Sequence, residues 1–208
     1  MDYSVIDRYI DRLMADTTPD KPIWNIENIK SGKKPGWNYI DGCMMTSLYS
    51  IYQQKNDGAY LDFIDGFVDY YVFADGSIRG YELETYNVDN INEGRILFDL
   101  YRETGKEKYR KAADLLYKQL LAQPRTGTGN FWHKKIYPNQ VWLDGLYMAQ
   151  VFYTRYETEF NDCKNYADIV KQFKSVYDNM YDKKKKLYYH GWDWSKKAFW
   201  ADKETGLS

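Results

Sequence analysis

The sequence is poor in cysteine and has no long apolar run. Its two cysteines, Cys43 and Cys163, lie far apart in the 208 residues. Two such residues exclude a disulfide framework, and we expect reduced thiols, as in the cytoplasm. No apolar run approaches the ~20 residues of a membrane span. The segment 1–8 is acidic and helix-prone rather than a signal peptide. We therefore expect a soluble, cytoplasmic protein.

An excess of charge of one sign is also absent. Lys and Arg total 29, Asp and Glu total 30, and the formal net charge is −1. Nucleic-acid surfaces normally need a basic excess, and membrane surfaces need a basic amphipathic helix. Neither partner is expected.

The sequence also lacks the common cofactor motifs. Only two histidines occur, His133 and His190, and no cluster of metal-ligand residues surrounds either. The glycine-rich segment 127–129 lacks the lysine and the strand of a phosphate-binding loop. No nucleophile elbow is present. We predict neither a metal nor a cofactor.

Aromatic residues are abundant instead. The chain has 22 Tyr, 9 Phe and 7 Trp, which make up 18% of it. Tyr and Trp combine an apolar body with a polar tip. Carbohydrate sites need that combination, because sugars present C–H faces for stacking and hydroxyls for hydrogen bonds. Tyr side chains that fill helix interfaces would explain the same composition, and both interpretations stay open.

Helical periodicity dominates the chain and repeats along it. We predict one all-α domain over 1–208, with helices at 3–15, 40–54, 59–73, 89–103, 106–121, 144–158 and 163–181. A glycine-rich loop is expected at 123–139 and a β-prone piece at 187–190. The pattern recurs with a period of about 50 residues. Repeated helical hairpins indicate a solenoid or a closed ring.

Three aspartates begin successive hairpins, each beside aromatic residues. They are Asp41, Asp89 and Asp144. Each could simply cap its helix, as Asp often does. In a ring, however, the three helix starts would converge, and paired carboxylates are the usual catalysts of glycoside cleavage.

Two segments resemble a known family. Residues 131–134 read Phe-Trp-His-Lys, and residues 140–149 read Gln-Val-Trp-Leu-Asp-Gly-Leu-Tyr-Met-Ala. These runs resemble the signature of the unsaturated rhamnogalacturonyl hydrolases, glycoside hydrolase family 105, which are related to the unsaturated glucuronyl hydrolases of family 88. The resemblance implies an (α/α)6 barrel of twelve helices.

The resemblance also implies a reaction. The substrate would be an oligosaccharide from pectin or glycan breakdown that ends in a Δ4,5-unsaturated uronic acid. A carboxyl group would protonate C4, water would add at C5, and the hemiketal would open to release a keto acid. By motif match, Asp144 would be the general acid and base, and Asp89 would orient or tune it.

The remaining residues implied by the resemblance would bind the substrate. His190 would contact the sugar or water, and His133 and Lys134 would line the uronate or the next sugar. Three further side chains would shape the pocket, namely Trp37, Trp142 and Met148.

The chain departs from the family in its extent. Seven predicted helices correspond to about the first half to two thirds of the barrel. A Trp-Gly-Arg-Gly type segment of the family, which supplies part of the site, is not among the 208 residues, so enzyme activity of this chain is left open. An open barrel edge would expose apolar helix faces, and we expect self-association through it.

Two other interpretations stay open. The chain could be another (α/α) barrel sugar enzyme, such as an inverting hydrolase or an epimerase. It could also be an inactive helical-repeat protein that only binds carbohydrate.

Overall fold

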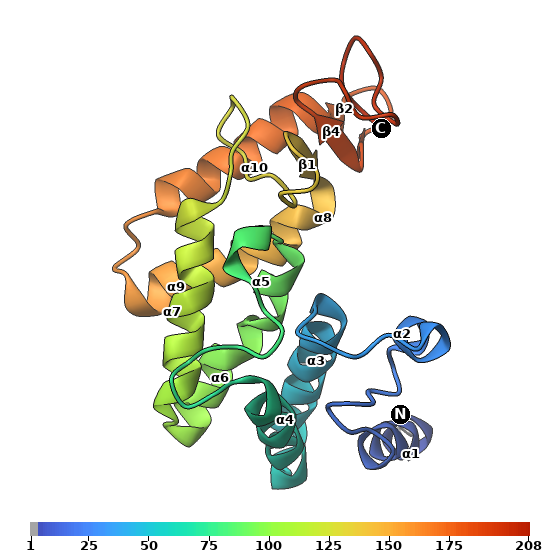
Figure 1. Cartoon of the computed structure of the whole chain (residues 1–208), viewed down its shortest axis with the longest axis vertical. Helices are drawn as coiled ribbons and strands as arrows, with labels where there is room; N and C mark the ends of the chain where they lie inside the picture. Colours follow the sequence, from blue (N-terminus) through green and yellow to red (C-terminus); the bar gives the residue numbers. More distant parts are fainter. Residues whose placement is uncertain (1–3) are drawn as a thin grey trace.

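The computed structural model describes residues 4–208 and is predominantly helical (Figure 1). Residues 1–3 of the acidic start and residue 3 of the first predicted helix lie outside the described part. The long helices are α1 (Ser4–Ala15), α3 (Tyr39–Lys55), α4 (Gly58–Tyr71), α6 (Arg95–Thr104), α7 (Glu107–Ala122), α9 (Val151–Phe160) and α10 (Tyr166–Met180). The short ones are α2 (Ile26–Ser31), η1 (Leu83–Thr85), α5 (Asp89–Glu93), α8 (Leu143–Gly145) and η2 (Leu146–Gln150), a π-helical turn.

The long helices pair into the hairpins that the repeat predicts. Helix α3 packs on α4, α6 on α7, and α9 on α10. Side-chain caps begin two of these helices: Asn38 accepts the N–H groups of Ile40 and Asp41, and Asp57 accepts that of Ala59. Such caps contribute about 1 kcal/mol each. Gly105 ends α6 with φ 67°, a left-handed conformation that glycine adopts without strain. The all-α hairpin prediction is confirmed.

Two predicted helices are interrupted where the packing is closest. The predicted helix 89–103 breaks at Gly94 into α5 and α6. A Cβ atom at Gly94 would lie 2.1 Å from Leu116 Cδ1 of α7, so only glycine allows the two segments to approach α7. The predicted helix 144–158 contains the π-helical turn η2, which packs on α5. Turns of this kind often mark functional sites.

The strands labelled β1, β2 and β4 lie with the C-terminus toward one end of the molecule, and α1 lies toward the other (Figure 1). Strand β1 (Gln140–Trp142) pairs antiparallel with β4 (Gly191–Asp193), so that Trp142 faces Gly191 across the ladder. Strand β2 (Tyr181–Asp182) pairs with β3 (Leu187–Tyr188). The β1–β4 ladder joins residues 140–142 to residues 191–193, which are far apart in sequence, and so brings the chain around His190 next to Trp142.

Two hydrophobic cores hold these elements together. The larger joins the helical hairpins, and the smaller lies beneath β1 and β4, built from Val141, Val176, Met180 and Trp192. None of the described helices is long and apolar enough to cross a membrane. Cys43 and Cys163 are free thiols.

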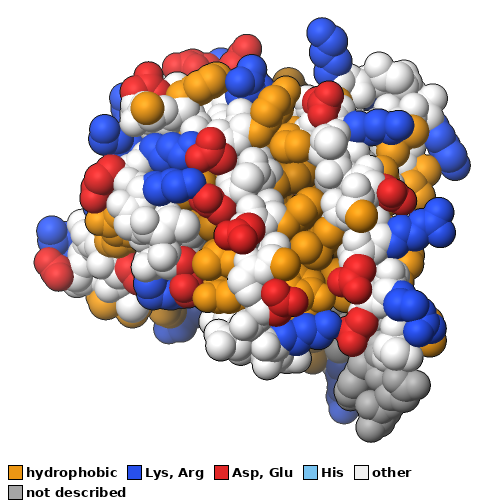
Figure 2. Space-filling model, turned by 90° about the horizontal axis from the view of Figure 1, so that it is seen from below, with side chains coloured by type: hydrophobic (Ala, Val, Ile, Leu, Met, Phe, Trp, Pro, Cys, Tyr) orange, Lys and Arg blue, Asp and Glu red, His pale blue; other side chains and the backbone are white. Residues whose placement is uncertain are grey.

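Part of the apolar surface stays exposed. Seen from below, a band of hydrophobic side chains runs between charged ones (Figure 2). On the outer face of α10, large apolar side chains are exposed at Val170, Phe173 and Tyr177. The expected self-association through an open edge stays a prediction.

Candidate active site

Asp89 begins α5 and carries two basic neighbours. Its Oδ1 lies 3.1 Å from Nε2 of His133, and its Oδ2 lies 2.6 Å from Nζ of Lys134. The side chain is only 13% exposed. Burial alone would raise the pKa of Asp89, but the hydrogen bonds and charges of His133 and Lys134 outweigh it and lower the pKa. Asp89 is therefore a fixed carboxylate rather than a proton donor.

The loop after α7 presents His133 to this carboxylate. The backbone N–H of Val88 donates to the carbonyl of His133 (3.1 Å), and the N–H of His133 donates to the carbonyl of Gln140 (2.9 Å). A carboxylate oxygen can only accept, so Nε2 of His133 carries a proton. Its other nitrogen, Nδ1, is buried and has no hydrogen-bond partner among the described residues. Gly145 provides the space for the ring, because a Cβ there would lie 3.0 Å from Nδ1.

Asp144 lies in α8, directly after β1. Its Oδ1 has no hydrogen-bond partner in the described part of the chain, and Nε2 of His190 lies 3.8 Å away. The Oδ1 atom itself is buried, while the side chain as a whole is 38% exposed. Carboxylate oxygens of Asp89 and Asp144 and a nitrogen of His133 all lie within 4.8 Å of one another. The two aspartates that begin successive hairpins thus share one site.

Aromatic rings frame these groups. Trp142 stacks on His133 (centroids 4.5 Å apart, planes at 15°) and on Tyr137 (5.2 Å, 15°). Its indole N–H donates to Oε1 of Gln140 at 3.1 Å. The β1–β4 pairing brings His190 to 5.9 Å from the Trp142 ring, and the N–H of Leu143 donates to the carbonyl of His190 at 2.7 Å.

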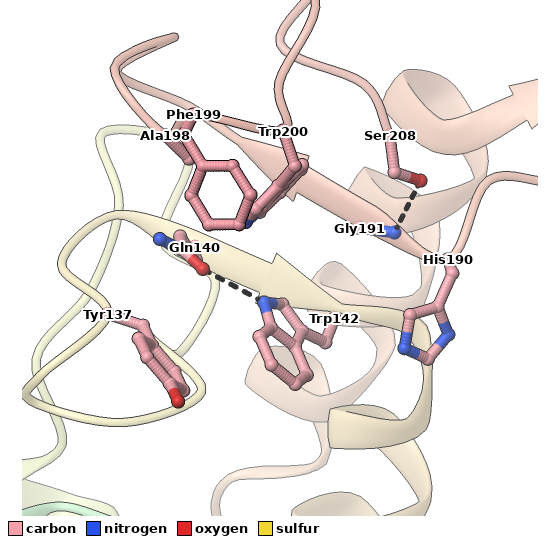
Figure 3. Close-up of a pocket in the computed structure, with 9 residues that line it drawn as sticks. All are labelled: Tyr137, Gln140, Trp142, His190, Gly191, Ala198, Phe199, Trp200 and Ser208. Carbon is pink, nitrogen blue, oxygen red and sulfur yellow. Dashed lines mark hydrogen bonds between the residues drawn. The ribbon is translucent and has the colours of Figure 1, made fainter.

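A cavity of about 600 Å³ opens beside Trp142 and His190 (Figure 3). Pockets for small ligands typically have this size, mostly apolar walls and a few polar groups. Its lining residues are Tyr137, Gln140, Trp142, His190, Gly191, Ala198, Phe199, Trp200 and Ser208. Phe199 stands over the hollow and is 97% exposed (Figure 3).

The wall that carries Phe199 is firmly held. The carboxylate of Asp193 accepts the backbone N–H groups of Ser195, Lys197 and Ala198. Gly191 leaves room for the neighbouring ring, because a Cβ there would lie 3.0 Å from the Trp200 ring. The loop 193–200 is thus a preformed wall of the cavity.

Residues 5–208 match Glycosyl Hydrolase Family 88. The chain belongs to this family. The resemblance to family 105 enzymes drawn from residues 131–134 and 140–149 is confirmed as well.

Three similar proteins illustrate the relationship, one by sequence and two by structure. An unsaturated rhamnogalacturonyl hydrolase, YesR of Bacillus subtilis (strain 168), is 26% identical over 163 residues, which are 76% of this chain and 45% of YesR. A family 105 glycoside hydrolase of C. acetobutylicum ATCC 824 is 44% identical, with a TM-score of 0.82 over 95% of this chain and 52% of that one. A possible family 105 member from Klebsiella pneumoniae subsp. pneumoniae MGH 78578 is 25% identical, with a TM-score of 0.67 over 77% of this chain and 42% of that one. The chain spans about half the length of these relatives.

Two predicted substrate-binding residues of this family 88 chain are placed differently from expectation. Trp37 is 4% exposed, and its indole N–H donates to the carbonyl of Asn90 at 2.8 Å. Met148 is 8% exposed and packs within the larger core. Both are buried because they hold α5 and η2 in place, so in this structure they support the site and do not face the cavity.

The structure pairs the ammonium group of Lys134 with Asp89. The expectation that Lys134 lines the uronate or the adjacent sugar stays a prediction. The atoms of Asp89, His133 and Asp144 that lie within 4.8 Å of one another are of the types that could also hold a metal ion. The absence of a metal stays a prediction.

Sequence reasoning missed several cavity residues. Tyr137, Gln140, Phe199, Trp200 and Ser208 line the hollow but were not expected there. The density of aromatic residues between 192 and 200 was the available signal. It could not be placed, because nothing in the local pattern shows that β4 pairs with β1.

Proposed function

We propose that this chain carries the two-carboxylate part of an active site that hydrolyses Δ4,5-unsaturated uronyl oligosaccharides. The proposal rests on the family and on the relatives, one of which is named as an unsaturated rhamnogalacturonyl hydrolase. The observation that carries it is the shared position of Asp89, His133 and Asp144 within 4.8 Å, beside an aromatic cavity. Such a cavity suits a sugar ring, because aromatic faces stack on C–H groups.

In this proposal Asp144 is the catalytic acid. Its protonated carboxyl group transfers a proton to C4 of the vinyl ether, and positive charge develops at C5 and the ring oxygen. Asp144, now a carboxylate, accepts a proton from the water that attacks C5. The hemiketal formed then opens, the bond to the neighbouring sugar breaks, and the uronyl residue leaves as a keto acid. Asp144 thereby regains the proton that it donated, and the proposed reaction requires no cofactor.

The surrounding groups divide the remaining tasks. Asp89 stays ionised beside Lys134 and His133, so it places negative charge close to where the cation develops. His190, near Asp144 Oδ1, orients the water or a sugar hydroxyl. Trp142 forms the floor under the unsaturated ring. A cytoplasmic location is part of this proposal, supported by the free thiols of Cys43 and Cys163.

The test follows the double bond directly. The ultraviolet absorbance of a Δ4,5-uronyl disaccharide should fall on incubation with the chain, and Asp144→Asn should lower the rate about 10²–10⁴-fold without loss of helical circular dichroism. Asp62→Asn, which removes an exposed carboxylate on α4, serves as the matched control. Wild-type turnover by Asp144→Asn would overturn the role of Asp144. Calorimetric binding without any loss of absorbance would instead favour a carbohydrate-binding protein.

A further inference from the structure

The helix that carries Asp89 is too short to be stable alone. Helix α5 has five residues, and isolated helices shorter than ~12 residues are marginal in water. Its position must come from tertiary contacts, and it packs closely on α3. Gly42 of α3 lies against its backbone, since a Cβ at Gly42 would be 2.4 Å from Glu93 Cα.

Three hydrogen bonds join α5 to residues 37–39, where α3 begins. The Trp37 indole donates to the carbonyl of Asn90 at 2.8 Å. The side-chain amide of Asn92 donates to the carbonyl of Tyr39 at 3.3 Å. The third bond runs from the backbone N–H of Asn38, the residue that caps α3, to Oε2 of Glu93. This last bond holds the C-terminal end of α5, whereas Asp89 lies at the N-terminal end.

Glu93 is an unusual residue to find in that position. Its side chain is completely buried, and Oε1 has no hydrogen-bond partner among the described residues. The titratable groups that face it are Asp41 on α3, itself fully buried, and Tyr71 on α4. Within residues 4–208, no Lys, Arg or His forms an ion pair with Glu93 or Asp41. Two buried carboxylates without a cation would repel each other strongly.

We propose that Glu93 is a positioning residue for Asp89. Glu93 is a buried, protonated carboxyl group that holds α5 against the start of α3. In the neutral form, Glu93 still accepts the N–H of Asn38 but adds no second charge beside Asp41. Ionisation would set Glu93 against Asp41 and loosen α5, and with it the carboxylate of Asp89. Burial, and then the charge of Asp41, raise the pKa of Glu93 well above its usual range, which agrees with this form. This inference depends on the proposed function in one respect, namely the reaction in which Asp89 takes part.

The first test needs no activity. Because the pKa of Glu93 is raised on folding, its neutral form contributes stability that is complete below the unfolded pKa of ~4.3 and is lost as pH rises through the folded pKa. Glu93→Gln keeps the shape and the acceptor but cannot ionise. We expect the Tm of wild type to fall relative to Glu93→Gln by at least about 2 °C between pH 5 and pH 8. Glu84→Gln, an exposed matched control, should track wild type. Parallel Tm changes for wild type and Glu93→Gln would overturn the proposal.

The second test separates positioning from bulk stability. Glu93→Gln should keep kcat and KM within about threefold of wild type, whereas Glu93→Ala should lower kcat by about 10²-fold with KM nearly unchanged. Should Glu93→Ala fail to fold, the Gln variant still decides, because a loss of kcat in that isostere would contradict a neutral Glu93. If wild type itself shows no turnover, carboxyl NMR of Asp89 replaces kcat: its pKa should stay low in Glu93→Gln and rise in Glu93→Ala. An unchanged Asp89 titration in Glu93→Ala would refute the positioning role while leaving the reaction class untouched.

Discussion

Trp142 lies flat against His133, with ring centroids 4.5 Å apart, and this stack orients the imidazole that contacts Asp89. The pair joins the aromatic cavity to the carboxylates, because one indole forms part of both. An aromatic stack of this kind contributes about 1 kcal/mol beyond the area that it buries. Its larger effect is geometric, since among the described residues only the Nε2 atom of His133, and not Nδ1, has a polar partner to orient the ring.

Replacing Trp142 should therefore cost more activity than stability. We expect Trp142→Ala to lower kcat/KM about 10²-fold, because both the sugar platform and the orientation of His133 are lost. Trp142→Phe, which keeps a ring but not the hydrogen bond to Gln140, should stay within about tenfold of wild type. Steady-state kinetics on a Δ4,5-uronyl disaccharide measures both variants. Equal rates for Trp142→Ala and wild type would show that the stack is dispensable.

The ion pair of Lys134 with Asp89 predicts a pH-dependent loss of stability. Lys134→Met leaves Asp89 with fewer positive neighbours, so the free energy of unfolding at pH 7 should fall by about 2 kcal/mol. A lowered Asp89 pKa means that this contribution exists above the unfolded value of ~3.9 and disappears as pH falls through the lower folded value. The difference between Lys134→Met and wild type should thus shrink from pH 7 to pH 3 in urea titrations. Lys135→Met is the control; a difference that stays constant with pH would contradict the assignment.

Two glycines should respond oppositely to alanine. Gly94→Ala forces a methyl group against Leu116 and should destabilise the protein by about 1–3 kcal/mol. Gly66→Ala adds the same methyl group within α4, where no other described residue beyond the adjacent helix backbone lies within 4 Å of it, and should stabilise by about 0.5–1 kcal/mol. Thermal unfolding compares the two. Similar Tm values for both variants would mean that the break between α5 and α6 relaxes easily.

Phe199 should matter for ligand affinity and hardly at all for folding. Because its side chain is 97% exposed, Phe199→Ala should leave Tm within about 1 °C. Loss of one stacking ring should weaken binding of a uronyl oligosaccharide about three- to tenfold. Calorimetry measures this without turnover. Phe173→Ala, on the outer face of α10, is the matched control, and an equal effect of both substitutions would exclude a specific role for Phe199.

The convergence of Asp89 and Asp144 was predictable, because it depends on hairpin repeats whose periodicity is visible in the sequence. Helix starts in successive hairpins meet at one end, and the structure places these two carboxylates in one site. Their catalytic roles stay predictions. The third aspartate expected to converge with them, Asp41, does not join this group: its buried carboxylate accepts the Trp24 and Asn38 side chains. Nor does Asp41 cap α3, because Asn38 does so.

Contacts made by loops were not predictable in the same way. The pairing of His133 with Asp89 depends on the loop 123–139, which has no periodicity that would place a side chain. The break at Gly94 depends on how closely α7 approaches, a tertiary property that helix propensity does not contain. Trp37 was assigned to the pocket by motif, but a tertiary contact places it in the core, where its indole donates to the carbonyl of Asn90.

The three-residue ladder between β1 and β4 also makes the cavity sensitive to alignment. Side chains alternate along a strand, so Val141 points into the smaller core while Trp142 points to the cavity. A slip of one residue would exchange these two faces, turn the indole toward Val176 and Met180, and place a valine in the cavity wall. Insertions between β1 and β4 are therefore tolerable only where they leave the opposition of Trp142 and Gly191 intact.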